Sequence, residues 1–277
     1  MIRSDWHIHT ECSYDATLSI PEIARDGGEL GITRFGITDH ANFNDEKFLS
    51  DLRASAAYVK QMQAIYPRLV LGVELTPIEK PEFDHIAQHG TREGYVAPTQ
   101  SEPFEIELAA DRDMLISLGV RYAIGAAHWR VDLPNAKQLP PDLNESIREW
   151  HRQQMYLAAD NRVTVLGHPW YHGKGLWYED FSVIPRSMHL ELAAALKENR
   201  KYVECNAHFF TKAKASERFR RQYAEFLREL FEEGIPVTYG SDSHKVYEQE
   251  IPTVISYLRA AGFREGDLCE IAEEDLW

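Results

Sequence analysis

Residues 5–15 read DWHIHTECSYD, in which two histidines separated by a single residue lie near the end of a predicted strand. This stretch is the starting point for predicting the fold and the site. In an extended strand, side chains two positions apart point to the same side, so His7 and His9 are expected to face the same way. Asp15 adds a carboxylate six residues after His9. Neutral imidazole and carboxylate are the ligands of zinc, manganese and iron, so the stretch predicts a metal site.

Outward from this stretch, short β-branched or apolar runs alternate with longer helical patterns. Strands are predicted at residues 3–9, 32–38, 69–75, 120–128, 163–168, 202–207 and 236–242. Helices are predicted near residues 20–30, 44–65, 103–118, 143–160, 188–199, 216–233 and 248–261. Strand–helix alternation of this kind predicts an α/β fold with a parallel sheet and its helices outside.

The alternation runs through the chain with no linker, repeat or low-complexity segment, so a single domain over residues 1–277 is expected. A doubly wound sheet and a barrel both fit the pattern. A dinucleotide-binding doubly wound sheet normally carries a glycine-rich loop after its first strand, whereas this chain has HIHTECSYD there. A TIM-like barrel collects its functional residues where the strands end, which can be checked in the sequence.

The ends of the predicted strands do carry candidate ligands. In chain order they are His7 and His9, Asp39 and His40, Glu74, His128, His168, Asn206 and His208, and Asp242 and His244. Buried together without a cation, these imidazoles and carboxylates would carry a heavy desolvation cost. Divalent cations explain the set directly, and the absence of clustered cysteines argues against an iron–sulfur or structural zinc site.

The ordered motifs HIHTECSYD, ITDH, GVEL, AAH, LGHP and GSDSH resemble those of the PHP (polymerase and histidinol phosphatase) family, from residue 5 to residue 245. The resemblance implies a distorted (β/α)7 barrel that holds three divalent metal ions (zinc, manganese or iron) and hydrolyses phosphate esters. It implies three ligand sets, with Glu74 bridging the first two: His7, His9, Glu74 and Asp242; Glu74, His128 and His168; and Asp15, His40 and His244. Some family members have histidine in place of Asp15, and a carboxylate there favours a harder ion.

The chemistry implied is attack by a hydroxide that bridges two metals, because no G-x-S-x-G elbow or Cys–His pair offers a protein nucleophile. Glu74, Asp242 and His208 are the predicted catalytic residues, with His208 a candidate general acid for the leaving group. Arg130 and Lys174 are candidate phosphate-binding residues, with ordinary surface charges as the alternative.

Two further features carry weaker expectations. The aromatic loop at residues 169–181 is a candidate substrate wall or lid, or a loop that packs on the barrel rim. Asp39 matches no direct ligand, so it is expected to orient an imidazole through a hydrogen bond, with a turn or capping role as the alternative.

Composition limits the partners. A net charge of -14 argues against nucleic acid, which proteins hold mainly with lysine and arginine, but leaves room for a small phosphorylated substrate. Three cysteines without disulfide or zinc-finger spacing predict reduced thiols and a cytoplasmic protein. The first residues lack the apolar run of a signal peptide, and no apolar segment is long enough to cross a membrane.

The function expected is metal-dependent hydrolysis of a small-molecule phosphate ester, and histidinol phosphate is the namesake candidate. One alternative is an amidohydrolase-like metal hydrolase, a class that usually has a metal-bridging lysine where this chain has His128. Another is a non-catalytic metal-binding barrel, although such copies lose ligands that this chain keeps.

Overall fold

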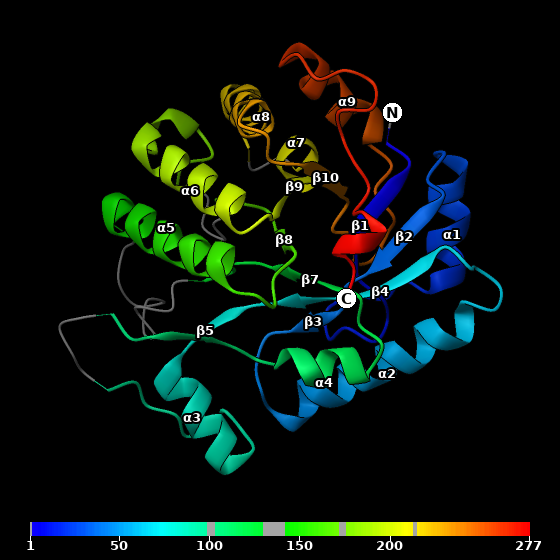
Figure 1. Ribbon diagram of the computed structural model, residues 1–277, viewed down its shortest axis with the longest axis vertical. Coiled ribbons are helices and arrows are strands. Elements are labelled where there is room, and N and C mark those ends of the chain that lie inside the picture. The colour runs from blue at the N-terminus through cyan, green and yellow to red at the C-terminus, as the bar shows by residue number, and fades with distance from the viewer. Residues whose placement is uncertain (1, 99–102, 130–141, 172–175, 213–214) are drawn as a thin grey trace.

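A computed structural model describes residues 2–98, 103–129, 142–171, 176–212 and 215–277 (Figure 1). Within these residues, seven strands pair side by side and in parallel. In sheet order they are β1 (Ser4–Ile8), β2 (Arg34–Ile37), β4 (Leu69–Leu75), β7 (Tyr122–Gly125), β8 (Val165–Leu166), β9 (Tyr202–Asn206) and β10 (Val237–Gly240). A two-residue strand, β3 (His40–Ala41), also pairs with β4 and continues the line of β2 beyond a short break.

The first and last strands of this series come together, so the sheet is a nearly closed barrel. The amide of Asp242 donates to the His7 carbonyl at 2.7 Å, and the amide of His9 donates to the Ser243 carbonyl at 3.0 Å. One parallel bridge, between Ile8 and Ser243, completes the contact. The predicted distorted barrel of seven parallel strands is therefore confirmed.

Helices surround the strands (Figure 1). The longer ones are α1 (Ile20–Glu29), α2 (Glu46–Met62), α3 (Lys80–His89), α5 (Leu143–Ala159), α6 (Arg186–Glu198), α8 (Glu217–Glu232) and α9 (Ile251–Ala260). The shorter elements are α4 (Arg112–Ser117), η1 (Phe181–Val183), α7 (His208–Thr211) and η2 (Glu273–Asp275). Ser19 and Glu22 form the predicted capping box at the start of α1. No helix in the described part of the chain is both long and apolar enough to cross a bilayer.

The helix predicted at residues 103–118 is wrong in its first half. Residues Ile106–Leu108 form β6, which pairs antiparallel with β5 (Pro77–Glu79). The helix there, α4, begins only after Asp111, whose side chain accepts a hydrogen bond from the Met114 amide. The apolar Ile106 and Leu108 are buried on either side of the half-exposed Glu107, an alternation that suits a strand edge better than a helix face. Helix α3 was not predicted.

An extra residue in β1 changes which way its side chains point. From Asp5 to Ile8 the strand advances three residues while its partner β2 advances two, from Phe35 to Ile37. A bulge of this kind lets two consecutive side chains face the barrel interior. Trp6 accordingly packs edge-on against Tyr122, with ring centroids 5.4 Å apart, and His7 still faces the metal-ligand candidates.

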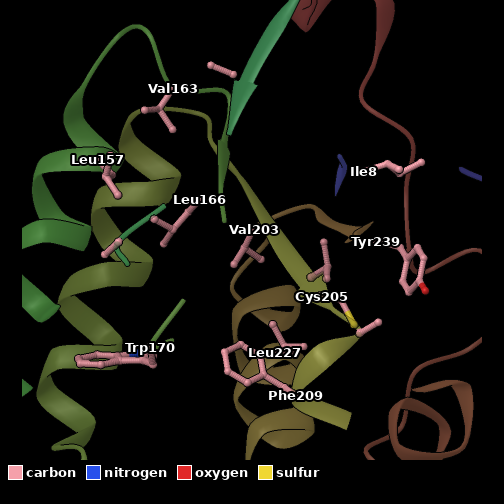
Figure 2. Packing of buried hydrophobic residues seen from close by; sticks show 14 of the residues in the cluster. Ile8, Leu157, Val163, Leu166, Trp170, Val203, Cys205, Phe209, Leu227 and Tyr239 are labelled. Atoms are coloured by element: carbon pink, nitrogen blue, oxygen red, sulfur yellow. The ribbon is translucent and has the colours of Figure 1, made fainter. Parts of the chain in front are cut away.

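The apolar residues form two clusters, one on each side of the sheet. The larger lies between strands and helices, where Leu166 and Val203 of the sheet face Leu157 of α5 and Leu227 of α8 (Figure 2). The smaller lies inside the barrel, mainly toward the N-terminal ends of its strands. Its members are Trp6, Val70, Tyr122, Ile124, Ala126, Val165 and Tyr202, together with Ile271 and Leu276 of the C-terminal segment. That segment covers this end of the barrel (Figure 1).

Candidate metal centre

The opposite end of the barrel gathers the residues that the sequence singled out at strand ends. His7 lies in β1, His40 in β3 and Glu74 in β4, all of them buried. His9, His128, His168, Asp242 and His244 come within four residues after the ends of strands, and Asp15 comes from the loop after β1. Because parallel strands end on the same side of a barrel, residues far apart in sequence meet there.

Glu74 is the centre of the cluster. Its carboxylate is fully buried, and its two oxygens lie within 3.5 Å of ring nitrogens from five histidines: His7, His9, His40, His128 and His168. Oε1 is 3.0 Å from His168 Nε2, and Oε2 is 2.7 Å from His40 Nδ1. The two oxygens thus face different histidines, as a carboxylate shared between two cations would require.

The other two carboxylates flank this centre. Asp242 Oδ1 lies 3.4 Å from His9 Nε2 and 3.7 Å from His7 Nε2. Asp15 Oδ2 lies 3.5 Å from Nε2 of both His40 and His244. Together the contacts connect all nine predicted ligands into one cluster.

Three groups within the cluster have ligand atoms that all lie within 4.8 Å of one another. They are His7, His9 and Asp242; His40, Glu74 and His128; and His9, His40 and His244. The first lies within the first ligand set that the family resemblance implies. The other two groups combine His9 and His40 with different partners than the implied sets do. Asp15 and His168 belong to none of the three groups.

The donor atoms fit divalent cations better than they fit one another. Nε2 of His7 and Nε2 of His9 lie 3.0 Å apart. The lone pairs of two such nitrogens repel each other, but both can bind the same cation. Among the described residues, the buried Nδ1 of His9 and Nδ1 of His168 have no hydrogen-bond partner. Buried polar atoms are normally paired, so ring nitrogens and carboxylate oxygens this close together indicate groups arranged to bind a cation.

Electrostatics support the same conclusion. Burial lowers the pKa of His7, but Glu204, Glu74 and Asp242 outweigh burial and raise that pKa well above its usual value. Burial likewise lowers the pKa of His40, yet Glu74 and Asp15 raise it to about 10. Protons on these imidazoles balance the carboxylates, and divalent cations would replace them in that role.

Two of the candidate ligands have strained backbones. His168 has φ 22° and Asp242 has φ 54°, in a region that residues with a Cβ atom rarely adopt. Such conformations persist where the surrounding structure holds them, and they concentrate at functional sites.

The remaining predicted site residues have different outcomes. His208 begins α7 at the same mouth, with Nδ1 3.2 Å from Asp242 Oδ2 and its side chain 23% exposed. Asn206 accepts the His208 amide through Oδ1 at 2.9 Å and donates to Asp242 at 3.2 Å. Arg130 and Lys174 lie outside the described residues, and so does the central part of the loop at residues 169–181.

The expectation that Asp39 orients an imidazole is wrong. Its carboxylate accepts hydrogen bonds from the amide and hydroxyl of Thr10, at 2.6 and 2.7 Å, and from the Ser55 hydroxyl at 2.6 Å. Asp39 therefore anchors the turn that follows His9 to helix α2, which was the alternative. The side chain points away from the cluster, toward Ser55 of helix α2.

Two polar residues at the site were not identified from the sequence. The Thr76 hydroxyl donates to Asn42 at 2.5 Å and lies 2.9 Å from His128 Nδ1, which can donate to it. Glu204 contacts His7 from within β9. Its only signal in the sequence is a carboxylate in the otherwise apolar start of YVECNA.

The barrel and the imidazoles and carboxylates at its mouth define a protein equipped to bind divalent metals. A family model described as the PHP domain matches residues 5–208, more than half of the chain. The chain therefore belongs to the PHP domain family.

Two comparisons extend this assignment. A curated protein from Acetivibrio thermocellus named "Probable phosphatase" is 25% identical over 248 residues, which cover 88% of this chain and 80% of that protein. The crystal structure of a histidinol phosphate phosphatase from Lactococcus lactis subsp. lactis Il1403, complexed with zinc, L-histidinol and phosphate, superposes with a TM-score of 0.69. That match covers 99% of this chain and 98% of the other at 17% identity, so it shows a shared fold.

Proposed function

We propose that this chain is a metal-dependent phosphatase that hydrolyses a small-molecule phosphate ester, and that residues 1–277 work as one domain. The observation that carries the proposal is the buried carboxylate of Glu74 with five imidazoles around it, in a chain that belongs to the PHP domain family. A carboxylate and imidazoles at such spacing are a typical ligand set for neighbouring divalent ions in hydrolases.

The nine clustered residues would hold the metals, which we propose to be three ions of zinc, manganese or iron. They are His7, His9, Asp15, His40, Glu74, His128, His168, Asp242 and His244. Bound there, the ions would supply Lewis acidity toward phosphoryl oxygens and an activated water at neutral pH. Glu74 and Asp242 take the predicted catalytic role by holding these ions at the reacting centre.

His208 has the position of a proton donor. Its ring is partly exposed at the mouth, and Asp242 lies close to one ring nitrogen, Nδ1. The carboxylate can accept a hydrogen bond from Nδ1–H, which leaves Nε2 to donate a proton to a departing alkoxide. Arg130 follows His128 closely in sequence and Lys174 follows His168, so both remain candidates for contact with the phosphate.

The substrate class follows from charge and from the relatives. The chain carries a net charge of -14, which disfavours a polyanionic nucleic acid but not a small phosphate that meets cations in the mouth. Relatives named as a probable phosphatase and a histidinol phosphate phosphatase support a phosphate ester, with histidinol phosphate as the first compound to test.

A non-catalytic metal-binding barrel is the second candidate function. The part of the chain that the structure describes keeps all nine predicted ligands at one mouth, which favours catalysis over a degenerate copy. An amidohydrolase-like hydrolase is disfavoured because His128 occupies the position where that class usually has a metal-bridging lysine.

The test is release of phosphate by protein that has been stripped with chelator and then reloaded with zinc, manganese or iron. The substrates would be p-nitrophenyl phosphate, histidinol phosphate, other monoesters, a diester and a carboxamide. Phosphate release that requires metal, with no amide cleavage, is the expected result. Stoichiometric metal binding with no turnover of any ester would favour the non-catalytic barrel, and amide cleavage would favour the amidohydrolase reading.

A further inference from the structure

Glu204 is a buried carboxylate beside the metal-ligand candidates and is not itself one of them. It lies in the middle of β9, with 1% of its surface exposed, and its side chain points into the barrel. Space for it comes from Gly240 on the neighbouring strand β10, where an added Cβ would lie 1.9 Å from Glu204 Oε1. A side chain at position 240 and the observed Glu204 therefore exclude each other.

The two oxygens of Glu204 reach two different ligand candidates. Oε1 lies 2.7 Å from Nδ1 of His7, and Oε2 accepts the backbone N–H of His168 at 2.5 Å. Oε2 also lies 3.3 Å from the Asn206 amide nitrogen, which donates in turn to Asp242 at 3.2 Å. One carboxylate is thus connected to one ligand candidate within β1 and to two others that follow β8 and β10.

Each contact fixes a different property of its partner. A proton on Nδ1 of His7 leaves the lone pair on Nε2, which is the nitrogen that faces Glu74 and Asp242. The bond to the His168 amide holds that residue at its strained φ of 22°, with its Nε2 3.0 Å from Glu74 Oε1.

We propose that Glu204 is a positioning residue that sets the tautomer of His7 and the backbone of His168, so that both present Nε2 to one metal pair, with Gly240 as its necessary neighbour. The proposal builds on the proposed function, since it assumes that these histidines bind metal. It assigns to Glu204 no contact with substrate.

Glutamine in place of Glu204 gives a sharp test because both principal partners are hydrogen-bond donors. Glutamine has nearly the same shape, but one of its two terminal atoms donates and would meet a donor. Glu204→Gln is expected to weaken zinc binding about tenfold to a hundredfold, the usual effect of losing the outer partner of a metal-binding histidine. If Glu204 only filled space, the same substitution would leave affinity unchanged.

The measurement is zinc affinity by competition with a chromophoric chelator, with unfolding by denaturant recorded on the metal-free protein. The ring nitrogen shifts of labelled histidine, measured by NMR, would report whether the His7 tautomer changes. Glu82→Gln is the matched control, because Glu82 is also a buried carboxylate but lies in helix α3 and pairs with Arg92. It is expected to leave zinc affinity and the histidine spectrum unchanged.

Two more variants keep the test decisive if Glu204→Gln does not fold. Glu204→Asp keeps the charge but is too short to reach both partners, so an intermediate loss of affinity is expected. Gly240→Ala should weaken zinc binding as well, because the added Cβ would lie 1.9 Å from Glu204 Oε1 and 2.7 Å from Cβ of His7. Parental zinc affinity in folded Glu204→Gln or Glu204→Asp, or an equal loss in Glu82→Gln, would overturn the proposal. These readouts do not depend on turnover, so a parent that binds zinc but hydrolyses no phosphate ester would refute the proposed function alone.

Discussion

The two ends of the barrel are built from the same strands and are chemically opposite. At the C-terminal ends of the strands, buried imidazoles and carboxylates crowd around Glu74. At the N-terminal ends, Trp6, Tyr122 and Tyr202 pack with the apolar residues of the C-terminal segment. Trp6 and His7 are neighbours in sequence, and the bulge in β1 sends one side chain to each end.

The polar groups named here at the two ends also differ in their hydrogen bonds. At the apolar end, the Trp6 indole donates to the Ser4 hydroxyl at 3.0 Å and the Tyr122 hydroxyl donates to the Trp6 carbonyl at 2.6 Å. At the mouth, buried ring nitrogens of His9 and His168 lack such partners within the described residues. Satisfied polar groups stabilise a fold, whereas unsatisfied ones reduce its stability and are retained for function. One end therefore stabilises the barrel, and the other is arranged to bind ligands.

The largest effect is expected from Glu74→Gln, because it acts at the centre of the mouth. The substitution keeps the size of the side chain but removes its charge and one of its two acceptor oxygens. We expect loss of the metals that Glu74 shares and a fall in kcat on the order of 10³-fold or more. Metal analysis and steady-state phosphate release would measure both.

The fold should survive this change, since the apolar end is untouched. Circular dichroism and denaturant unfolding of the metal-free protein serve as the control. Full metal content together with near-parental turnover would remove Glu74 from the centre of the mechanism.

Trp6→Phe tests the other end. It leaves a gap beside Tyr122 and removes the indole that donates to Ser4, so we expect the free energy of unfolding to fall by about 2 kcal/mol. The zinc affinity of the folded protein should stay parental. A specific loss of metal affinity, measured well below the melting temperature, would show that the two ends are not independent.

Asp15→Asn is expected to have a smaller effect at the mouth. Asp15 lies 3.5 Å from His40 and His244 and is partly exposed, at the margin of the cluster. Loss of its charge should lower the binding affinity of one metal ion by about tenfold and leave the affinity of the others unchanged. In a metal titration, only one of the binding steps should become weaker. Loss of every ion at once would mean that the cluster binds its metals as one cooperative unit.

The smallest effect is expected from His189 on α6, outside the barrel. Burial beside Phe181 and Phe226, with help from the charge of Arg186, lowers the pKa of His189 to about 4 from its usual 6.5. The unfolded chain binds a proton at a higher pH than the folded chain does, so stability is lost as pH falls from 6.5 toward 4. After discounting for partial exposure, the loss between pH 7.5 and pH 5 is about 1 kcal/mol.

His189→Phe should remove this contribution and leave the acid sensitivity of the mouth in place. Denaturant unfolding of the metal-free parent and variant at the two pH values would measure this. The free energy of unfolding should fall less between pH 7.5 and pH 5 in the variant than in the parent. An identical pH dependence in both proteins would assign the whole acid response to other groups, including the mouth.

Local sequence patterns predict the alternation of strands and helices and the types of residue at the strand ends. Strand LVLGVEL was predicted with the bounds that β4 has, and the capping box at Ser19 was found in place. These features are local, because a period of two, a period near 3.6 and a capping pattern are set by residues close in the chain. The same local signals failed at residues 103–108, where pairing with β5 overrides a helical pattern.

Which of those residues meet depends on the barrel as a whole. His7 and Glu204 are 197 positions apart and touch because β1, β9 and β10 share one barrel, with Gly240 leaving the space between them. Asp39 and Asp15 are both carboxylates near His40, yet one turns to Thr10 and the other to the mouth. The direction of a side chain after a strand depends on the turn and on its distant neighbours, and no local pattern contains that information.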